Sequence, residues 1–103
     1  MCKLSIIIPV MQQKKFLSRC LESVFNQNFE NYEIIINGHS PGNCKKIVLK
    51  YRDNRICYIE FTENLGLHQA RVQGATVARS EYLMHLDSDD VLLHDSVLSS
   101  LML

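Results

Sequence analysis

Short strand-like runs alternate with helical stretches along this chain, and this alternation limits its fold more than any other feature. The run from Leu4 to Val10 is rich in β-branched residues and apolar on both alternate faces, which is typical of a strand covered on both sides. Apolar residues then recur at spacings of three and four from Phe16 to Phe25, which predicts an amphipathic helix. Tyr32 to Ile36 repeats this pattern of a buried strand, and Ile56 to Phe61 and Tyr82 to Leu86 are the other expected strands. The other expected helices are Cys44 to Tyr51, Leu67 to Ala78 and a last one from near Asp95.

A chain in which strand and helix alternate in this way folds into a parallel sheet with helices on both faces, joined by right-handed crossovers. We therefore expect an α/β, Rossmann-like fold with three layers, helix on sheet on helix, and a mostly parallel sheet. No repeat or linker divides residues 1–103, which should form one domain. Ligands of such sheets bind beyond the carboxyl ends of the strands, so the loops after the first, second and fourth strands form the expected binding region.

The composition excludes several classes of protein. Hydrophobic residues make up 47% and charged residues 21% of the 103, as in globular domains and unlike disordered chains. The 11 basic and 11 acidic residues cancel, so no global field attracts nucleic acid. The four cysteines are widely spaced and are interpreted as free thiols, and neither a signal peptide nor a run of the ~20 apolar residues that span a bilayer is found. We expect a cytoplasmic protein, with a peripheral position at the inner face of the membrane as the alternative.

Three carboxylates, Asp87, Asp89 and Asp90, directly follow the fourth predicted strand. Like charges this close repel one another unless a cation or water offsets them, and carboxylate oxygens suit Mg²⁺ and Mn²⁺. Residues i and i+2 of an extended segment point to the same side, so Asp87 and Asp89 are expected to converge. The alternative is a polar turn whose aspartates cap the helix that follows. The cluster alone does not decide between a metal site and such a turn.

Several segments, taken in order, resemble a known family. They are Ser5-Ile6-Ile7-Ile8-Pro9-Val10, Phe16-Leu17-x-x-Cys20-Leu21-x-Ser23-Val24-x-x-Gln27, Asn31-Tyr32-Glu33-Ile34-Ile35, Glu63-Asn64-x-Gly66, Ala70-Arg71-x-x-Gly74, Ser80-Glu81-Tyr82 and Leu86-Asp87-Ser88-Asp89-Asp90. Together they resemble the first half of a family 2 glycosyltransferase with a GT-A fold, over essentially the whole chain. Residues 1–103 would then be the N-terminal, nucleotide-sugar-binding part of that domain, ending after the Asp-x-Asp motif.

The resemblance implies an inverting glycosyltransferase that takes a sugar from a nucleotide-sugar donor, usually a UDP-sugar, with Mn²⁺ or Mg²⁺ as cofactor. Asp89 would be the principal metal ligand, with Asp87 and Asp90 in the same metal site. Asp87 would also contact the ribose or the sugar, and Ser88 is counted among the donor-binding residues. Arg71 matches an arginine that lies near the nucleotide, where a guanidinium suits a diphosphate.

The chain departs from the family pattern where the base binds. Pro9 and Val10 match the loop that wraps the base, but the usual aromatic residue and Asn fall on Met11 and Gln12. After the second strand the family places Asp-Asp-Gly-Ser, whereas this chain has Asn37-Gly38-His39-Ser40, apparently one residue shorter. No carboxylate then remains to accept from a uracil N–H. Asn37 or a backbone carbonyl would have to substitute for it.

Histidines fall near the same segments. For His39 and His68 the alternatives are a contact with the donor and a solvated side chain. His85 lies within the fourth predicted strand and is expected to be packed and hydrogen-bonded rather than a ligand.

The general base and the acceptor-binding half of such an enzyme are expected beyond Leu103, so no catalytic residue is assigned within this chain. The acceptor of the full-length enzyme would be a saccharide or a lipid-linked molecule. An unpaired sheet edge and the apolar C-terminal end predict self-association. The alternative function is a non-catalytic nucleotide-binding or assembly module of the same fold, and Gly38 favours it. A dinucleotide-binding dehydrogenase is a weaker option, because no glycine-rich turn follows the first strand.

Overall fold

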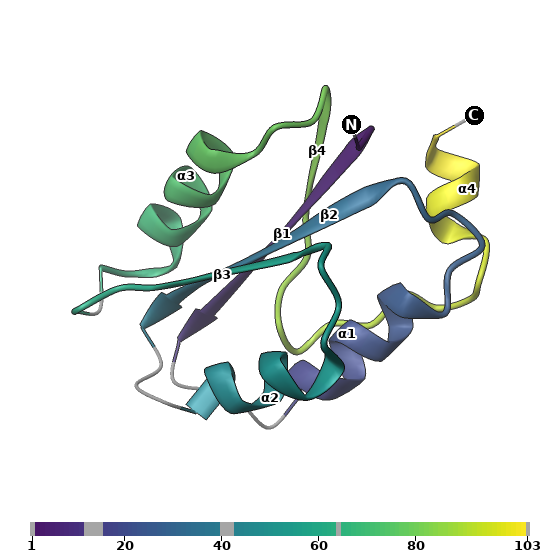
Figure 1. Ribbon diagram of the computed structural model, residues 1–103. Coiled ribbons are helices and arrows are strands. Elements are labelled where there is room, and N and C mark those ends of the chain that lie inside the picture. The colour runs from purple at the N-terminus through teal and green to yellow at the C-terminus, as the bar shows by residue number, and fades with distance from the viewer. Residues whose placement is uncertain (1, 12–15, 40–42, 64, 103) are drawn as a thin grey trace.

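The computed structural model describes residues 2–11, 16–39, 43–63 and 65–102, in which strands and helices alternate (Figure 1). The elements are β1 (Leu4–Met11), α1 (Leu17–Phe25), β2 (Tyr32–His39), α2 (Asn43–Tyr51), β3 (Ile56–Glu60), α3 (Leu67–Val77), β4 (Tyr82–His85) and α4 (Val97–Leu101). No described helix has the length and apolar character that crossing a membrane requires.

The strands form one sheet in the order β3-β2-β1-β4, and every neighbouring pair is parallel. Leu4 of β1 pairs with Tyr32 of β2 on one side and with Tyr82 of β4 on the other. β1 and β2 are therefore the central strands, as their apolar residues on both faces predicted. The predicted parallel α/β sheet is confirmed.

Helices cover both faces of the sheet, so the three expected layers are present (Figure 1). On one face, Ile6, Ile8 and Val10 join a buried cluster with residues of α1, α2 and α4. Each fully buried isoleucine stabilises such a core by about 1.5–3 kcal/mol. On the other face, α3 lies close to the strands through small residues: a Cβ added at Gly74 would lie 2.5 Å from Cγ2 of Ile7.

β2 is longer than the sequence predicted. Asn37, Gly38 and His39 were expected in a loop, but they pair with the last three residues of β1, and Asn37 and Gly38 also pair with β3. Hydrogen bonds to two neighbouring strands therefore outweigh the turn preference of Asn-Gly. Gly38 adopts a φ of 148°, which side chains rarely tolerate. The loop prediction for these three residues was wrong.

β4 forms an edge of the sheet, and this position corrects the expectation for one histidine. β4 pairs with β1 alone among the described strands, and His85 at its end is exposed. The prediction that His85 is packed was wrong: His85 pairs with Ile7 on the face covered by α3, and α3 packs mainly against β1 and β2 rather than over the edge strand.

A buried carboxylate lies near the amino end of the sheet. Glu33 accepts hydrogen bonds from the Ser5 hydroxyl at 2.5 Å, the Arg79 backbone N–H at 2.8 Å and the Ser80 hydroxyl at 3.5 Å. Burial raises the pKa of Glu33, but these hydrogen bonds and the nearby Arg79 guanidinium outweigh burial and hold it below its usual value. Glu33 therefore ties the chain between α3 and β4 to the centre of the sheet.

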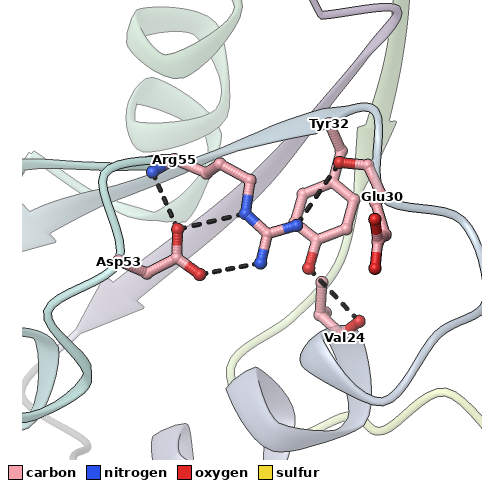
Figure 2. Close-up of polar contacts among 5 residues, drawn as sticks. All are labelled: Val24, Glu30, Tyr32, Asp53 and Arg55. Carbon is pink, nitrogen blue, oxygen red and sulfur yellow. Dashed lines mark hydrogen bonds and ion pairs between the residues drawn. The ribbon is translucent and has the colours of Figure 1, made fainter.

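A second polar cluster closes the same end (Figure 2). The Arg55 guanidinium donates to both carboxylate oxygens of Asp53, at 3.0 and 2.7 Å, and to the Glu30 carbonyl at 3.3 Å. It also lies 4.4 Å from the centroid of the Tyr32 ring, and the Tyr32 hydroxyl donates to the Val24 carbonyl at 3.5 Å. The hydrogen bonds from Arg55 lower the pKa of Asp53. This cluster joins the starts of β2 and β3 to the end of α1.

Candidate functional site

The carboxylate cluster lies where β4 ends, beside the carboxyl end of β1. The Leu86 N–H donates to the Ile7 carbonyl at 2.9 Å, which keeps the chain beside β1 just before the cluster. Residues two apart on a strand direct their backbone groups to the same side, so Pro9, which has no N–H, faces the side on which β4 has ended. The chain is thus free to leave the sheet at Asp87.

A turn brings the three carboxylates together. The Asp90 N–H donates to the Asp87 carbonyl at 3.0 Å, with Ser88 and Asp89 at the two central positions. Oxygen atoms of Asp87, Asp89 and Asp90 all lie within 4.8 Å of one another. The predicted convergence is therefore correct, but its predicted cause was wrong, because the segment is turned rather than extended.

The alternative interpretation of the cluster was a polar turn that caps the next helix. The turn is present, but Ser96 holds the N-cap position of α4, and no side-chain cap is found there. The aspartates therefore do not serve as the cap of that helix.

Arg71 approaches the cluster from α3. Its Nη2 donates to an Asp87 carboxylate oxygen at 2.8 Å, while Nε is buried and has no hydrogen-bond partner among the described residues. The two side chains are 37% and 43% exposed, and a pair this exposed contributes only ~0–1 kcal/mol to stability. The pair therefore sets the charge of the site more than it stabilises the fold.

Cys20 of α1 contacts the same turn. The sequence did not indicate this residue as part of the site. Its thiol donates to the Asp87 carbonyl at 3.6 Å. Burial, followed by the negative charges of Asp90, Asp89 and Asp87, raises the pKa of Cys20 to about 12. Cys20 is therefore a protonated, unreactive thiol at neutral pH. The local signal was its place on the apolar stripe of α1, which predicted burial only.

The residues expected near the base contribute mainly backbone. Pro9 and Val10 are buried in β1, and Val10 belongs to the core cluster. Asn37 is also buried; its Nδ2 donates to the Ala70 carbonyl at 2.6 Å, and its Oδ1 has no hydrogen-bond partner among the described residues. A Cβ added at Gly38 would lie 1.8 Å from the Val10 carbonyl oxygen, so this backbone leaves no room for a side chain.

Other residues considered from the sequence are placed less directly. His39 lies at the end of β2, with Nδ1 3.2 Å from the Phe61 carbonyl oxygen. His68 is exposed in the first turn of α3. Gln12 and Ser40 lie outside the described residues. None of these residues is assigned to the carboxylate site.

A groove of about 470 Å³ runs alongside α1, where Arg19 and Glu22 face residues 91–95. It borders the segment after the carboxylates rather than the carboxyl ends of β1 and β2, so we do not place a donor in it.

Known proteins resemble this chain over nearly its whole length. The family model described as glycosyl transferase family 2 matches residues 5–102. The glycosyltransferase GlyA of Streptococcus pneumoniae is 36% identical over 98 residues, which cover 92% of this chain and 14% of that protein.

Solved structures agree in fold. Residues 1–349 of TarS from Staphylococcus aureus match with a TM-score of 0.89 and 25% identity, over 97% of this chain and 31% of the TarS chain. The mannosyltransferase PcManGT of Pyrobaculum calidifontis, at 16% identity, matches with a TM-score of 0.85 over 94% of this chain and 30% of its own. The predicted GT-A fold is confirmed. This chain thus spans less than a third of each of these proteins, and across residues 5–102 it belongs to glycosyl transferase family 2.

Proposed function

We propose that residues 1–103 form the donor-binding part of a glycosyltransferase, in which Asp87, Asp89 and Asp90 hold a divalent cation and, through it, the diphosphate of a nucleotide-sugar. The observation that carries the proposal is the convergence of these carboxylates to within 4.8 Å at the carboxyl end of the sheet. Family membership supports a role in glycosyl transfer.

The residues present fit Mn²⁺ or Mg²⁺. All the side chains of the cluster offer carboxylate oxygens, the donors that these cations prefer, and the exposed positions of Asp89 and Asp90 leave room for phosphate and water. Asp89 is the proposed principal ligand, Asp90 supports the same site, and Asp87 and Ser88 face the ribose or the sugar. When bound, such a cation offsets the charge that grows on the departing diphosphate.

Arg71 supplies the positive charge of the chain itself at this site. Its guanidinium contacts Asp87, and its buried Nε–H has no acceptor among the described residues. A planar guanidinium donates in parallel to phosphate oxygens. We propose that Arg71 orients the diphosphate between α3 and the carboxylate turn.

The base of the donor would meet backbone atoms. Since Gly38 has no room for a carboxylate, recognition falls to the backbone at the ends of β1 and β2, around Pro9, Val10 and Asn37. TarS has been solved with UDP and with UDP-GlcNAc, and PcManGT with GDP-Man and Mn²⁺. A UDP-sugar is the proposed donor, and GDP is the comparison that tests it.

The remaining parts of the proposed reaction follow the family resemblance. Transfer inverts the anomeric carbon, and the acceptor is a saccharide or a lipid-linked molecule. The general base and the acceptor surface are assigned to parts of the protein other than residues 1–103, and the working location is the cytoplasm or the inner face of the membrane. We also propose self-association through the open edge of β4, where Tyr82 and Leu83 are 49% and 47% exposed; sedimentation velocity at two concentrations tests it.

A non-catalytic module of the same fold is the second candidate, favoured by the absence of room for a carboxylate at Gly38. Calorimetry with UDP, UDP-GlcNAc and GDP, each with and without Mn²⁺, separates the two proposals. A donor site predicts nucleotide binding that requires Mn²⁺ and that weakens at least roughly 100-fold in Asp89→Ala, since losing even a group that supports a metal ligand costs about 10–100-fold. Glu81→Ala removes an exposed acid away from the cluster and should bind like the wild type. A folded, monodisperse sample that binds none of these nucleotides would overturn the donor site.

A further inference from the structure

One face of α1, together with the residues that follow the helix, is hydrogen-bonded to the segment that carries and follows the carboxylates. We call Cys20, Ser23 and Gln27 the α1 seam; Cys20 and Ser23 share a face of α1, and Gln27 lies just beyond the end of the helix at Phe25. The Cys20 thiol donates to the Asp87 carbonyl at 3.6 Å, and Ser23 Oγ accepts from the Leu92 N–H at 3.0 Å. The seam therefore begins at the carboxylate turn and continues past it.

Gln27 makes the largest contribution to the seam. It is 6% exposed, and both ends of its amide are used. Nε2 donates to the His94 carbonyl at 2.6 Å, and Oε1 accepts from the Leu98 N–H at 3.0 Å. The backbone N–H of Asn28 adds a bond to the Asp95 carbonyl at 2.7 Å. The chain from Leu92 to Leu98 is thus held at four backbone groups by α1 and the residues at its end.

The segment that carries and follows the carboxylates has little regular secondary structure. Between the end of β4 and the start of α4 at Val97, residues 86–96 contain neither helix nor strand. No ladder of backbone hydrogen bonds fixes the carboxylate turn from its C-terminal side. Meanwhile the three carboxylates repel one another, and this repulsion favours a more open turn. Something must hold the turn closed before a cation arrives.

We propose that Ser23 and Gln27 are positioning residues that hold the carboxylate turn in its metal-binding shape. The proposal rests on the donor site proposed above. Losing a group that orients the ligands of a metal typically weakens metal affinity by about 10–100-fold, because such groups reduce the cost of assembling the site. Neither residue touches the cation or the donor; they act through the backbone from Leu92 to Leu98.

The test uses pairs of variants in the whole chain, with Mn²⁺ and UDP as the probes. Ser23→Ala removes the hydroxyl that accepts from Leu92 and costs little volume, whereas Ser23→Thr keeps a hydroxyl. Gln27→Met keeps the length of the side chain and loses the hydrogen bonds of its amide to the Ser23 and His94 carbonyls and the Leu98 N–H. Ser23→Ala and Gln27→Met should weaken Mn²⁺-dependent UDP binding about tenfold, the lower end for groups that support metal ligands. Ser23→Thr should restore most of the affinity.

A control at the opposite end of the sheet separates positioning from general destabilisation. Asp53→Asn weakens the Arg55 cluster and lowers the melting temperature, but the distance from the site should leave UDP binding within about twofold of wild type. Without Mn²⁺, the wild type and every variant should show the same weak or absent UDP binding, because the seam acts on the cation site alone.

The outcomes distinguish the inference from the proposal beneath it. If the wild type binds Mn²⁺-UDP and both seam variants bind equally well, while amide exchange shows that residues 92–98 have been released, the positioning role is wrong and the donor site stands. If Asp53→Asn loses as much affinity as the seam variants at an equal loss of melting temperature, the effect is general stability and the positioning role is again wrong. If the wild type itself shows no Mn²⁺-dependent binding, the donor site is overturned and the positioning role falls with it.

Discussion

The two ends of the sheet use acidic residues in opposite ways. At the amino end, Glu33 and Asp53 are each matched by several donors, and hydrogen bonds hold the pKa of both below the usual value. At the carboxyl end, three carboxylates crowd one turn, and Arg71 on Asp87 is the only ion pair to the cluster among the described residues. Acids at the amino end stabilise the fold, whereas those at the carboxyl end are left for a ligand to complete.

The unmatched groups follow the same division. Asn37 Oδ1 and Arg71 Nε are the buried side-chain atoms without a hydrogen-bond partner in the described part of the chain, and both residues lie at the carboxyl half of the sheet or on α3 above it. Buried polar atoms that lack partners are costly and tend to mark sites of function. The contrast between the two ends of the sheet can be tested by substitutions that remove a charged group at each end.

The largest effect on stability is expected from Glu33→Gln. The amide keeps one oxygen but places an NH₂ group against donors, so the free energy of unfolding in urea should fall by about 2 kcal/mol. UDP binding should not change. The exposed Glu81→Gln serves as the control and should leave stability unaltered. A variant that kept its stability but lost nucleotide binding would break the division between the two ends.

Acid should remove the advantage of Glu33. Because the folded state holds the pKa of Glu33 low, its contribution is complete above the unfolded-state pKa of about 4.3 and is lost as the pH falls through the folded-state value. The stability difference between wild type and Glu33→Gln should therefore shrink as the pH is lowered below about 4.3. Urea titrations at a series of acidic pH values measure it; a constant difference would mean that the charge of Glu33 is not what stabilises the fold.

Arg71→Gln should show the reverse pattern at the carboxyl end. Loss of the guanidinium should weaken Mn²⁺-UDP binding about tenfold, or about 1.4 kcal/mol, by removing a charged donor to the diphosphate. Stability should stay within about 0.5 kcal/mol because the ion pair to Asp87 is exposed to solvent. Arg71→Lys keeps the positive charge but not the planar, two-pronged guanidinium, and its affinity for Mn²⁺-UDP should lie between those of the wild type and Arg71→Gln. A large loss of stability in Arg71→Gln would place this arginine with the structural groups.

The smallest effect is expected from Asp53→Asn. The amide retains part of the hydrogen bonding to Arg55, so unfolding should become easier by about 1 kcal/mol, with nucleotide binding unchanged. Thermal melts beside the exposed Glu63→Gln control would measure this difference. No change at all would show that the Tyr32 ring and the Glu30 carbonyl suffice to hold Arg55.

Local sequence patterns predicted the strands and helices of the fold. They were wrong where the structure of a segment depends on pairing with strands distant in the sequence. The apolar faces of β1 and β2 correctly placed these strands in the centre of a parallel sheet, since burial on both faces has a direct compositional signal. Asn37 to His39 were misassigned because turn preference is a local property, whereas their pairing involves β1 and β3 at once. The exposure of His85 depends on β4 being an edge strand, which strand order alone determines.

The candidate site shows the same limit. The spacing of Asp87, Asp89 and Asp90 predicted that their carboxylates converge, although a turn rather than an extended segment brings them together. Cys20 was visible only as part of the apolar pattern of α1, and Gln27 only as part of a segment that resembles the family, because their partners lie more than sixty residues further along the chain. Hydrogen bonds of this kind leave no periodic trace in a sequence.

The strand order also sets when the site can exist during synthesis. β1 emerges first but waits for β4, the last strand of the four, to fill its second side, as the pairing of Leu4 with both Tyr32 and Tyr82 shows. Until then, one edge of the most apolar strand in the chain is open to other nascent chains. The pairing of β4 with β1, which places the carboxylate turn, also covers that edge. One edge of β1 therefore stays open until β4 has been made, and ligand binding can begin only once that edge is paired.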